Sequence, residues 1–245
     1  LEIAYGGDDF DFDSEPLNLI ASLENRKSEP EAKIPTLADF EPDFGSCEGV
    51  KDARTGELLD PKLVQAGRKK EIQEMVHFNV YHFVPTAQTL GRGKTVRGKW
   101  VDEARENGTV VRSRLVAMEV AYEMRSDTFS GTPPLLMVRY VISRAASVPN
   151  NATRQQQRYI TIYDVTCAFL HARMDSLMFV ILPAGLSPPN RRAQLDGALY
   201  GARRASFLWG EKIGDILVND YGFTRIKNCP QAYHHKKYDI FVVVH

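Results

Sequence analysis

Hydrophobic residues recur at helical spacing in three segments of the chain. The first segment is short, stops before Pro85 and has a face made of Ile72, Met75, Val76, Asn79 and Val80; ordered structure is expected from near Pro61 onward. The second covers residues 135–146, and the third starts at Trp209 and stops near Gly222. These segments are predicted to form helices, each with one face against a core.

Strand patterns lie between the helical segments. Residues 95–101 and 109–117 alternate in polarity, and Asn107-Gly108 between them is the turn signal of a β-hairpin. Residues 158–163 and the apolar run 238–245 are also predicted strands. Because the helices are set between strands without a regular strand–helix repeat, the pattern favours an α+β fold.

One predicted strand ends on an acid. In residues 158–163, Ile160 and Ile162 share one side, and period two places Asp164 on that side as well. A carboxylate on an apolar side needs an ion pair, a hydrogen bond or a metal. The alternative is that Asp164 caps the turn or helix that follows it.

Charge is distributed unevenly along the chain although the formal net charge is zero. Residues 1–50 contain 13 acidic and 3 basic side chains, and the remaining residues contain 18 acidic and 28 basic ones, a net of +10. Residues 1–60 also lack periodicity, which predicts an acidic, disordered linker. A basic body behind an acidic leader favours a polyanionic partner such as nucleic acid, although solvation alone can also account for such charges.

Composition excludes several classes of protein. No apolar run approaches the ~18–20 residues of a membrane helix, so no membrane partner is expected. The three cysteines, Cys47, Cys167 and Cys229, are far apart and form no CxxC motif. This spacing argues against a disulfide framework or a zinc site and for a reducing compartment.

Short motifs in a fixed order resemble the reverse transcriptase of Ty1/copia-type retrotransposons from roughly Lys69 to His245. The matching motifs are Val84-Pro85, Gly98–Val101, Arg112–Ala117, Asp127–Phe129, Asp164–His171, Pro183–Gly185 and Leu199–Gly201, followed by Trp209 and Gly222-Phe223. The resemblance implies the fingers and a partial palm of a right-hand polymerase, with an antiparallel palm sheet and packed helices. It assigns residues 61–150 to a fingers-like part and residues 151–245 to a partial palm.

The resemblance also implies roles for the Asp164 motif. Asp164 would be the first catalytic carboxylate and would ligate two Mg²⁺ ions, with the Val165 carbonyl as a further ligand. Phe169 would lie under the sugar and exclude a 2′-hydroxyl. The implied partners are an RNA template, a DNA primer, deoxynucleoside triphosphates and the rest of the Pol polyprotein.

Further residues are implied to contact the substrates. Lys99, Arg112 and Arg114 on the hairpin would neutralise the incoming triphosphate, and Arg112 and Arg114 are expected on one face. Tyr200 and Gly201 would touch the nascent base pair, where glycine permits a close backbone approach. Two further cations open the next helix and either contact template phosphate or are simply exposed to solvent: Arg203 and Arg204.

Two other interpretations remain open beside an RNA-directed DNA polymerase. The basic body equally fits a non-catalytic nucleic-acid-binding relic or a domesticated module, and the acidic leader alone fits a scaffold that binds partners. The family's habits imply a cytoplasmic particle or the nucleus, and the sequence itself leaves the location open.

The sequence is expected to stop before the family's second catalytic motif, an aromatic-Val-Asp-Asp turn, so that these 245 residues hold one of three expected carboxylates. Since nucleotidyl transfer depends on charge neutralisation by such groups, we predict no primer extension by these residues alone. Extension of a labelled DNA primer on an RNA template, lost on Asp164→Asn, would contradict the prediction.

Overall fold

The computed structural model describes residues 2–4, 40–120, 132–147 and 158–244. The chain divides into two compact units that alternate along the sequence. Unit 1 comprises Leu1–Arg26, Phe129–Ala168 and Trp209–His245, and unit 2 comprises Lys27–Thr128 and Phe169–Leu208. The unit boundaries therefore differ from those expected at residues 60 and 150. Most of the expected linker, residues 5–39, and the Asp127–Phe129 motif lie outside the described residues.

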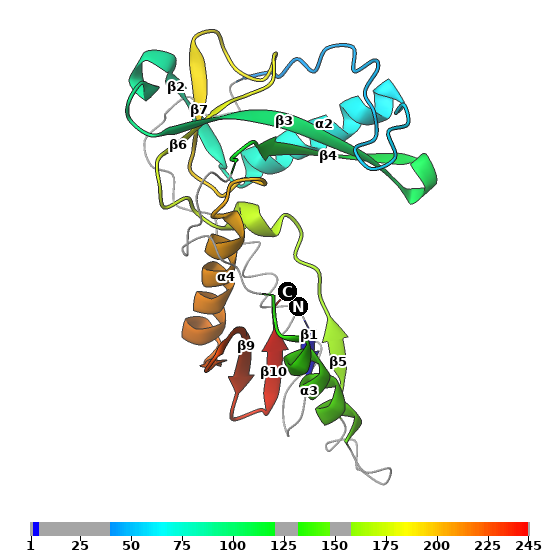
Figure 1. Cartoon of the computed structure of the whole chain (residues 1–245), viewed down its shortest axis with the longest axis vertical. Helices are drawn as coiled ribbons and strands as arrows, with labels where there is room; N and C mark the ends of the chain where they lie inside the picture. The colour runs from blue at the N-terminus through cyan, green and yellow to red at the C-terminus, as the bar shows by residue number, and fades with distance from the viewer. Residues whose placement is uncertain (1, 5–39, 121–131, 148–157, 245) are drawn as a thin grey trace. The chain divides into compact units, whose positions relative to one another are not determined.

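Unit 2 is built on a five-stranded sheet in the order β2-β7-β6-β3-β4 (Figure 1). The strands are β2 (Tyr81–Pro85), β3 (Lys94–Arg105), β4 (Val110–Ala117), β6 (Met178–Ile181) and β7 (Arg191–Leu195). β3 and β6 run parallel, whereas the other neighbours are antiparallel. Two short 3₁₀ helices, η2 (Thr86–Thr89) and η6 (Ala168–His171), follow β2 and precede β6.

The predicted hairpin is confirmed as the β3–β4 pair, which is antiparallel over eight residue pairs from Gly98–Ala117 to Arg105–Val110. Its turn is η3 (Glu106–Gly108), where Asn107 has φ 57° and Gly108 has φ 87°. Left-handed backbone suits asparagine and glycine. The Asn107-Gly108 pair therefore predicts the turn because both residues tolerate left-handed backbone.

A long helix, α2 (Pro61–His77), packs against β4 (Figure 1). It begins at the N-cap Asp60, whose carboxylate accepts hydrogen bonds from the N–H groups of Lys62 and Leu63. The expectation that Asn79 and Val80 continue its face is wrong. Asn79 adopts φ 49°, which ends the helical path, and Val80 leads into β2 instead.

A buried ion pair fixes α2 to the hairpin. Arg68 Nη2 lies 2.8 Å from Asp102 Oδ2, and Ser113 Oγ donates to the same carboxylate over 2.6 Å. The guanidinium of Arg68 also lies 5.1 Å from the ring centroid of Trp100. The carboxylate is therefore satisfied on both oxygens, as a buried charge requires.

Residues 40–60, the end of the expected linker, belong to unit 2 and pack against its helix and hairpin. Cys47 forms a buried cluster with Val64 and Val111. The buried carboxylate of Asp52 accepts hydrogen bonds from the backbone N–H groups of Ala104, Thr55 and Arg54, which lower its pKa to about 2. These contacts tie the segment to β3.

Unit 1 contains an antiparallel sheet in the order β5-β1-β10-β9-β8. Its strands are β1 (Glu2–Ala4), β5 (Ile160–Ile162), β8 (Thr224–Ile226), β9 (Cys229–His235) and β10 (Ile240–Val243). The two predicted strands of this unit are thus present in shortened form as β5 and β10. The mixture of strands and helices in the chain agrees with the expected α+β class.

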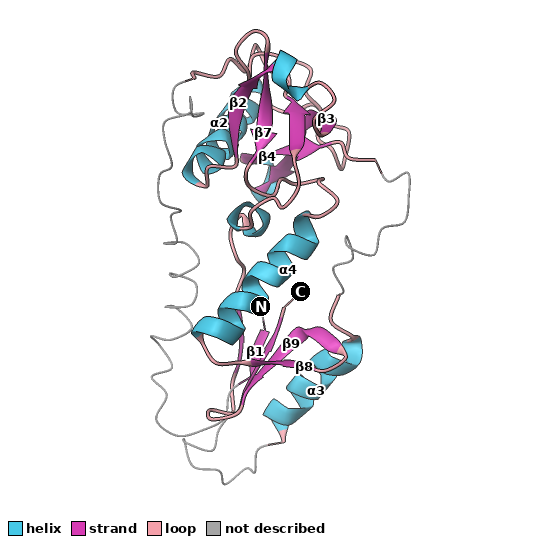
Figure 2. Ribbon diagram, turned by 90° about the vertical axis from the view of Figure 1, so that its left-hand side faces the viewer, coloured by secondary structure: helices cyan, strands magenta, loops and turns pink. Residues whose placement is uncertain are grey.

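Helices cover both faces of this sheet (Figure 2). The predicted helix α3 (Leu135–Ala146) places Val141 in a core cluster with Ala232, Phe241 and Val243. On the other face, Gly214 of α4 (Ala205–Asp215) approaches Tyr233, and α4 continues into the π-helical turn η7 (Ile216–Asp220). The apolar face predicted for this helix is buried: Trp209, Ile213, Ile216 and Leu217. No helix in the described segments is long and apolar enough to cross a membrane.

The contact between α2 and β4 depends on a glycine. A Cβ added at Gly67 would lie 2.4 Å from the carbonyl oxygen of Val111 and 2.8 Å from Ser113 Oγ. We predict that Gly67→Ala lowers the free energy of unfolding by about 1–3 kcal/mol, because the backbones must separate. Gln65→Ala, at an exposed position of the same helix, should change it by less than about 0.5 kcal/mol in urea unfolding. Equal effects of the two changes would contradict the predicted clash.

Candidate functional site

The expected site residues divide between the two units. Asp164 and Val165 belong to unit 1. The others belong to unit 2: Lys99, Arg112, Arg114, Phe169, Tyr200, Gly201, Arg203 and Arg204.

Three of the expected cations share one face of the hairpin. The β3–β4 register pairs Lys99 with Val116, and it pairs Val101 with Arg114 and Glu103 with Arg112. Directly paired residues lie on the same face of an antiparallel ladder. Arg112 and Arg114 therefore share a face as predicted, and the register adds Lys99 to it. The opposite face carries Trp100 and Asp102, which contact Arg68 of α2.

Tyr200 brings together Arg114 and Phe169, two residues that are 55 positions apart in the sequence. The guanidinium carbon of Arg114 lies 5.0 Å from the centroid of the Tyr200 ring, within cation–π range. The ring of Phe169, in η6, lies 5.4 Å from the same Tyr200 ring at an interplanar angle of 51°. We call these three residues the Tyr200 platform. It offers a flat cation and two aromatic surfaces, a combination that can bind a base and a phosphate.

Gly201 does permit a close backbone approach, but the group that lies close to it belongs to another segment of the chain. Its φ is 79°, and an added Cβ would lie 2.2 Å from the carbonyl oxygen of Ala117. One residue earlier, the carbonyl of Tyr200 accepts a hydrogen bond from the Ala117 N–H over 2.7 Å. Glycine is required here so that the loop can lie on the end of β4.

Arg203 and Arg204 precede α4 rather than lying in it. Arg204 donates from Nε to Asp175 Oδ1 over 2.9 Å and lies over the ring of Phe207. The backbone N–H of Arg203 donates to Glu119 Oε2 over 2.7 Å. Arg204 thus has an acidic partner within unit 2, and a contact of either residue with template phosphate stays a prediction.

Two acids that the sequence analysis passed over lie beside these residues. Glu71 of α2 accepts a hydrogen bond from the Leu115 N–H of β4 over 3.2 Å, and Glu119 follows β4. Burial raises the pKa of Glu71 to about 7, although the Leu115 N–H and the charges of Arg114 and Arg112 oppose the rise. Helical spacing puts Glu71 next to Ile72 on the buried side, but only tertiary packing shows that it meets β4.

In unit 1, Asp164 lies two residues beyond β5 and is exposed. The expectation of a carboxylate on an apolar side is wrong, because Ile160 and Ile162 are themselves 41% and 72% exposed. The reason is position: β5 is three residues long and lies at the end of the sheet order. Within the described part of the chain the Asp164 carboxylate has no hydrogen-bond or ion-pair partner, so it caps neither the following turn nor η6.

An exposed carboxylate with oxygen ligands nearby is chemically suitable for Mg²⁺. Asp164 supplies one such oxygen, and the backbone carbonyl of Val165 is next to it in the chain. Among the described residues, no group of three His, Cys, Asp or Glu side chains could hold a metal ion. These two oxygen donors therefore fit an open site with few protein ligands.

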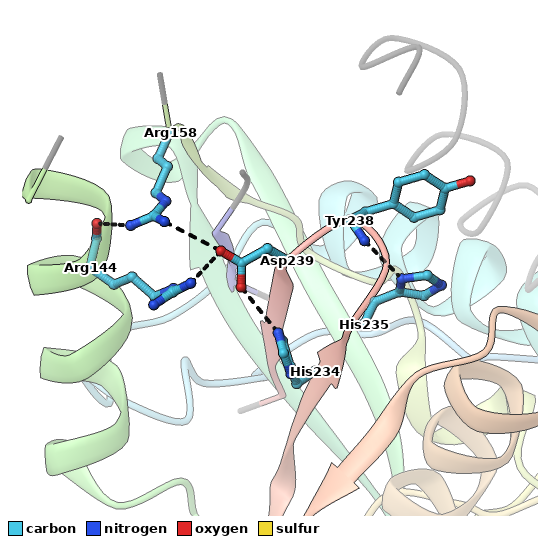
Figure 3. A network of polar contacts seen from close by, with 6 residues as sticks. All are labelled: Arg144, Arg158, His234, His235, Tyr238 and Asp239. Carbon is cyan, nitrogen blue, oxygen red and sulfur yellow. Dashed lines mark hydrogen bonds and ion pairs between the residues drawn. The ribbon is translucent and has the colours of Figure 1, made fainter. Parts of the chain in front are cut away.

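A polar network anchors the segment that leads into β5 (Figure 3). Asp239, in the β9–β10 turn, forms ion pairs with Arg144 of α3 and with Arg158, two residues before β5. Asp239 Oδ1 also lies 3.1 Å from His234 Nε2. Burial opposes ionisation of Asp239, but hydrogen bonds from Arg144 and His234 outweigh it and lower its pKa. His234 lies on β9 and stacks on Phe241, with ring centroids 4.2 Å apart.

The comparisons with known proteins give one match. A family model described as reverse transcriptase (RNA-dependent DNA polymerase) matches residues 78–244, which is more than half of the chain. Neither the comparison with curated proteins nor that with solved structures gives a match. The matched range contains every site residue that the sequence motifs pointed to.

The raised pKa of Glu71 predicts that the stability of the fold depends on pH. Its carboxyl has a pKa near 4.5 when unfolded and about 7 when folded. Folding therefore favours the protonated form, so this contribution to stability is full below pH 4.5 and is lost as pH rises through 7. We predict that Glu71→Gln, which keeps an acceptor for Leu115, removes this dependence and is more stable than wild type at pH 8 by about 2–3 kcal/mol.

Urea unfolding at pH 4.5, 6, 7 and 8 measures this effect. Glu57→Gln, at an exposed position of the same unit, is the matched control and should follow the wild-type curve. Parallel pH profiles for Glu71→Gln and wild type would show that Glu71 is not titrating in this range.

Proposed function

Because the chain belongs to the reverse transcriptase (RNA-dependent DNA polymerase) family, we propose that it is part of an RNA-directed DNA polymerase of a Ty1/copia-type retrotransposon. In this proposal the Tyr200 platform binds the incoming deoxynucleoside triphosphate, and Asp164 belongs to the catalytic centre. Its partners would be an RNA template, a DNA primer and the rest of the Pol polyprotein. The single observation that carries the proposal is the convergence of Arg114, Tyr200 and Phe169.

The platform has the chemistry that a nucleotide requires. Arg114 is a planar cation that is held by stacking on Tyr200, and its buried Nε has no hydrogen-bond partner among the described residues. A guanidinium that is placed by stacking keeps its outer N–H groups for phosphate oxygens. Phe169 beside Tyr200 would contact the sugar, where a bulky ring disfavours a 2′-hydroxyl.

The same hairpin face would bind the charged backbone or triphosphate. Lys99 and Arg112 are exposed on the face that also carries Arg114. The acid on this face, Glu103, is paired with Arg105 over 2.5 Å. The face is therefore cationic, which supports a polyanionic partner.

In unit 1, Asp164 and the Val165 carbonyl would hold Mg²⁺. Bound there, the metal would stabilise charge on the reacting phosphate oxygens. The exposed position of Asp164 beyond the end of β5 leaves the carboxylate accessible to a metal ion. We assign unit 2, with the hairpin, to a fingers-like part and unit 1, with its antiparallel sheet, to a palm-like part. With Asp164 as its one assigned metal carboxylate, the 245-residue chain by itself is proposed to be inactive in primer extension.

The proposal predicts that binding of nucleotide and of nucleic acid can be separated. Arg114→Ala should weaken binding of a deoxynucleoside triphosphate, measured by calorimetry with template–primer and Mg²⁺ present, by about tenfold or more. Arg114→Lys should recover little, because an ammonium lacks the planar face that stacks on Tyr200. Arg112→Ala and Lys99→Ala should each reduce the salt slope of template–primer binding by about one.

Arg139→Ala, at an exposed position of α3 in unit 1, is the control for loss of one positive charge. If the wild-type chain binds template–primer but no nucleotide, the nucleotide site is refuted. The alternative of a non-catalytic nucleic-acid-binding module would then stand in its place.

A further inference from the structure

We propose that Glu119 is a positioning residue that holds the loop carrying Tyr200 against the end of β4. Glu119 lies two residues beyond β4, and its side chain is only 4% exposed. One carboxylate oxygen accepts from Lys94 Nζ over 2.8 Å, and the other accepts from the Arg203 N–H over 2.7 Å. Both oxygens are thus engaged, one at the start of β3 and one in the Tyr200 loop.

The carboxylate is held in its charged form. Burial alone would raise the pKa of Glu119, but the hydrogen bonds from Lys94 and from the Arg203 backbone outweigh burial and lower it. A charged acceptor makes a stronger hydrogen bond to a backbone N–H than a neutral one does. Glu119 is therefore suited to fixing a backbone rather than to proton transfer.

The anchored loop makes two more contacts with the same end of β4. The N–H of Ala117 donates to the Tyr200 carbonyl over 2.7 Å, and Gly201 lies directly on the Ala117 carbonyl. Glu119 adds a third attachment on the far side of Gly201, at Arg203. Attachment at both ends of a glycine with φ 79° limits the freedom of the most flexible residue in the loop.

The position of the Tyr200 ring depends on this loop. The ring has Arg114 at 5.0 Å and Phe169 at 5.4 Å, and these two residues come from other segments. A shift of the loop would therefore separate the three members of the platform. The consequence for nucleotide binding rests on the function proposed above, whereas the attachment of the loop does not.

Three variants and one control test the role of Glu119. Glu119→Ala removes both contacts, Glu119→Gln keeps an oxygen for the Arg203 N–H, and Lys94→Met removes only the ion pair. Glu211→Ala is the matched control, because it removes a surface ion pair with Arg225 in unit 1 and leaves the hairpin face unchanged. Each variant is compared with wild type by amide hydrogen exchange, thermal unfolding and nucleotide affinity with template–primer bound.

We expect Glu119→Ala to accelerate amide exchange at Arg203 and also at Ala117, whose N–H donates to the carbonyl of Tyr200 in the anchored loop. Nucleotide affinity should fall by about tenfold, whereas template–primer affinity should match that of Glu211→Ala. Glu119→Gln should lie between wild type and Glu119→Ala, and Lys94→Met should show a smaller change in the same direction. If Glu119→Ala does not fold, these two variants carry the test.

Unchanged exchange at Ala117 in the Glu119 variants would overturn the positioning role. Faster exchange with unchanged nucleotide affinity would overturn its link to the platform. If the wild-type chain binds no nucleotide at all, the proposed function fails, and the exchange rates at Ala117 and Arg203 still decide the role of Glu119.

Discussion

The outer edge of β4 is the constraint on which unit 2 depends. β4 ends the sheet order, so every second backbone group along it points away from β3 and needs a partner. The Leu115 N–H finds the carboxylate of Glu71, and the Ala117 N–H finds the carbonyl of Tyr200. An open edge would otherwise pair with another chain. Satisfying it brings α2 and the Tyr200 loop to the same strand.

This solution also shapes the electrostatics of the cationic face. Gly67 lets α2 approach β4 closely enough for Glu71 to reach Leu115, and this approach buries a carboxyl near Arg114. Because burial keeps that carboxyl largely protonated below pH 7, it neutralises the arginines less than an exposed acid would. The hairpin face thus stays positively charged although the carboxyl of Glu71 is hydrogen-bonded to β4.

In unit 1 a network of side chains, rather than edge contacts of the backbone, stabilises the short strand β5. β5 has three residues and lies at the end of its sheet, so few ladder hydrogen bonds fix it. The Asp239 network compensates by binding Arg158, which precedes the strand, and Arg144 of α3. Asp164, beyond the other end of β5, is exposed. An accessible carboxylate on an anchored strand is consistent with a metal ligand of the reverse transcriptase family.

The sequence by itself determined the elements whose signals are local. The Asn107-Gly108 turn, the alternation that puts Arg112 and Arg114 on one face, and helix α3 all follow from backbone preference and period. Only the tertiary structure decided what these elements meet. Period two predicts that Asp164 shares a side with Ile160 and Ile162, but exposure depends on whether anything covers that side, and nothing local encodes it. In the same way, the stacking of Arg114 on Tyr200 and the hydrogen bond of Glu119 to Arg203 each join segments more than 80 residues apart. Tertiary packing, and not the neighbouring sequence, decides which groups meet the edge of β4.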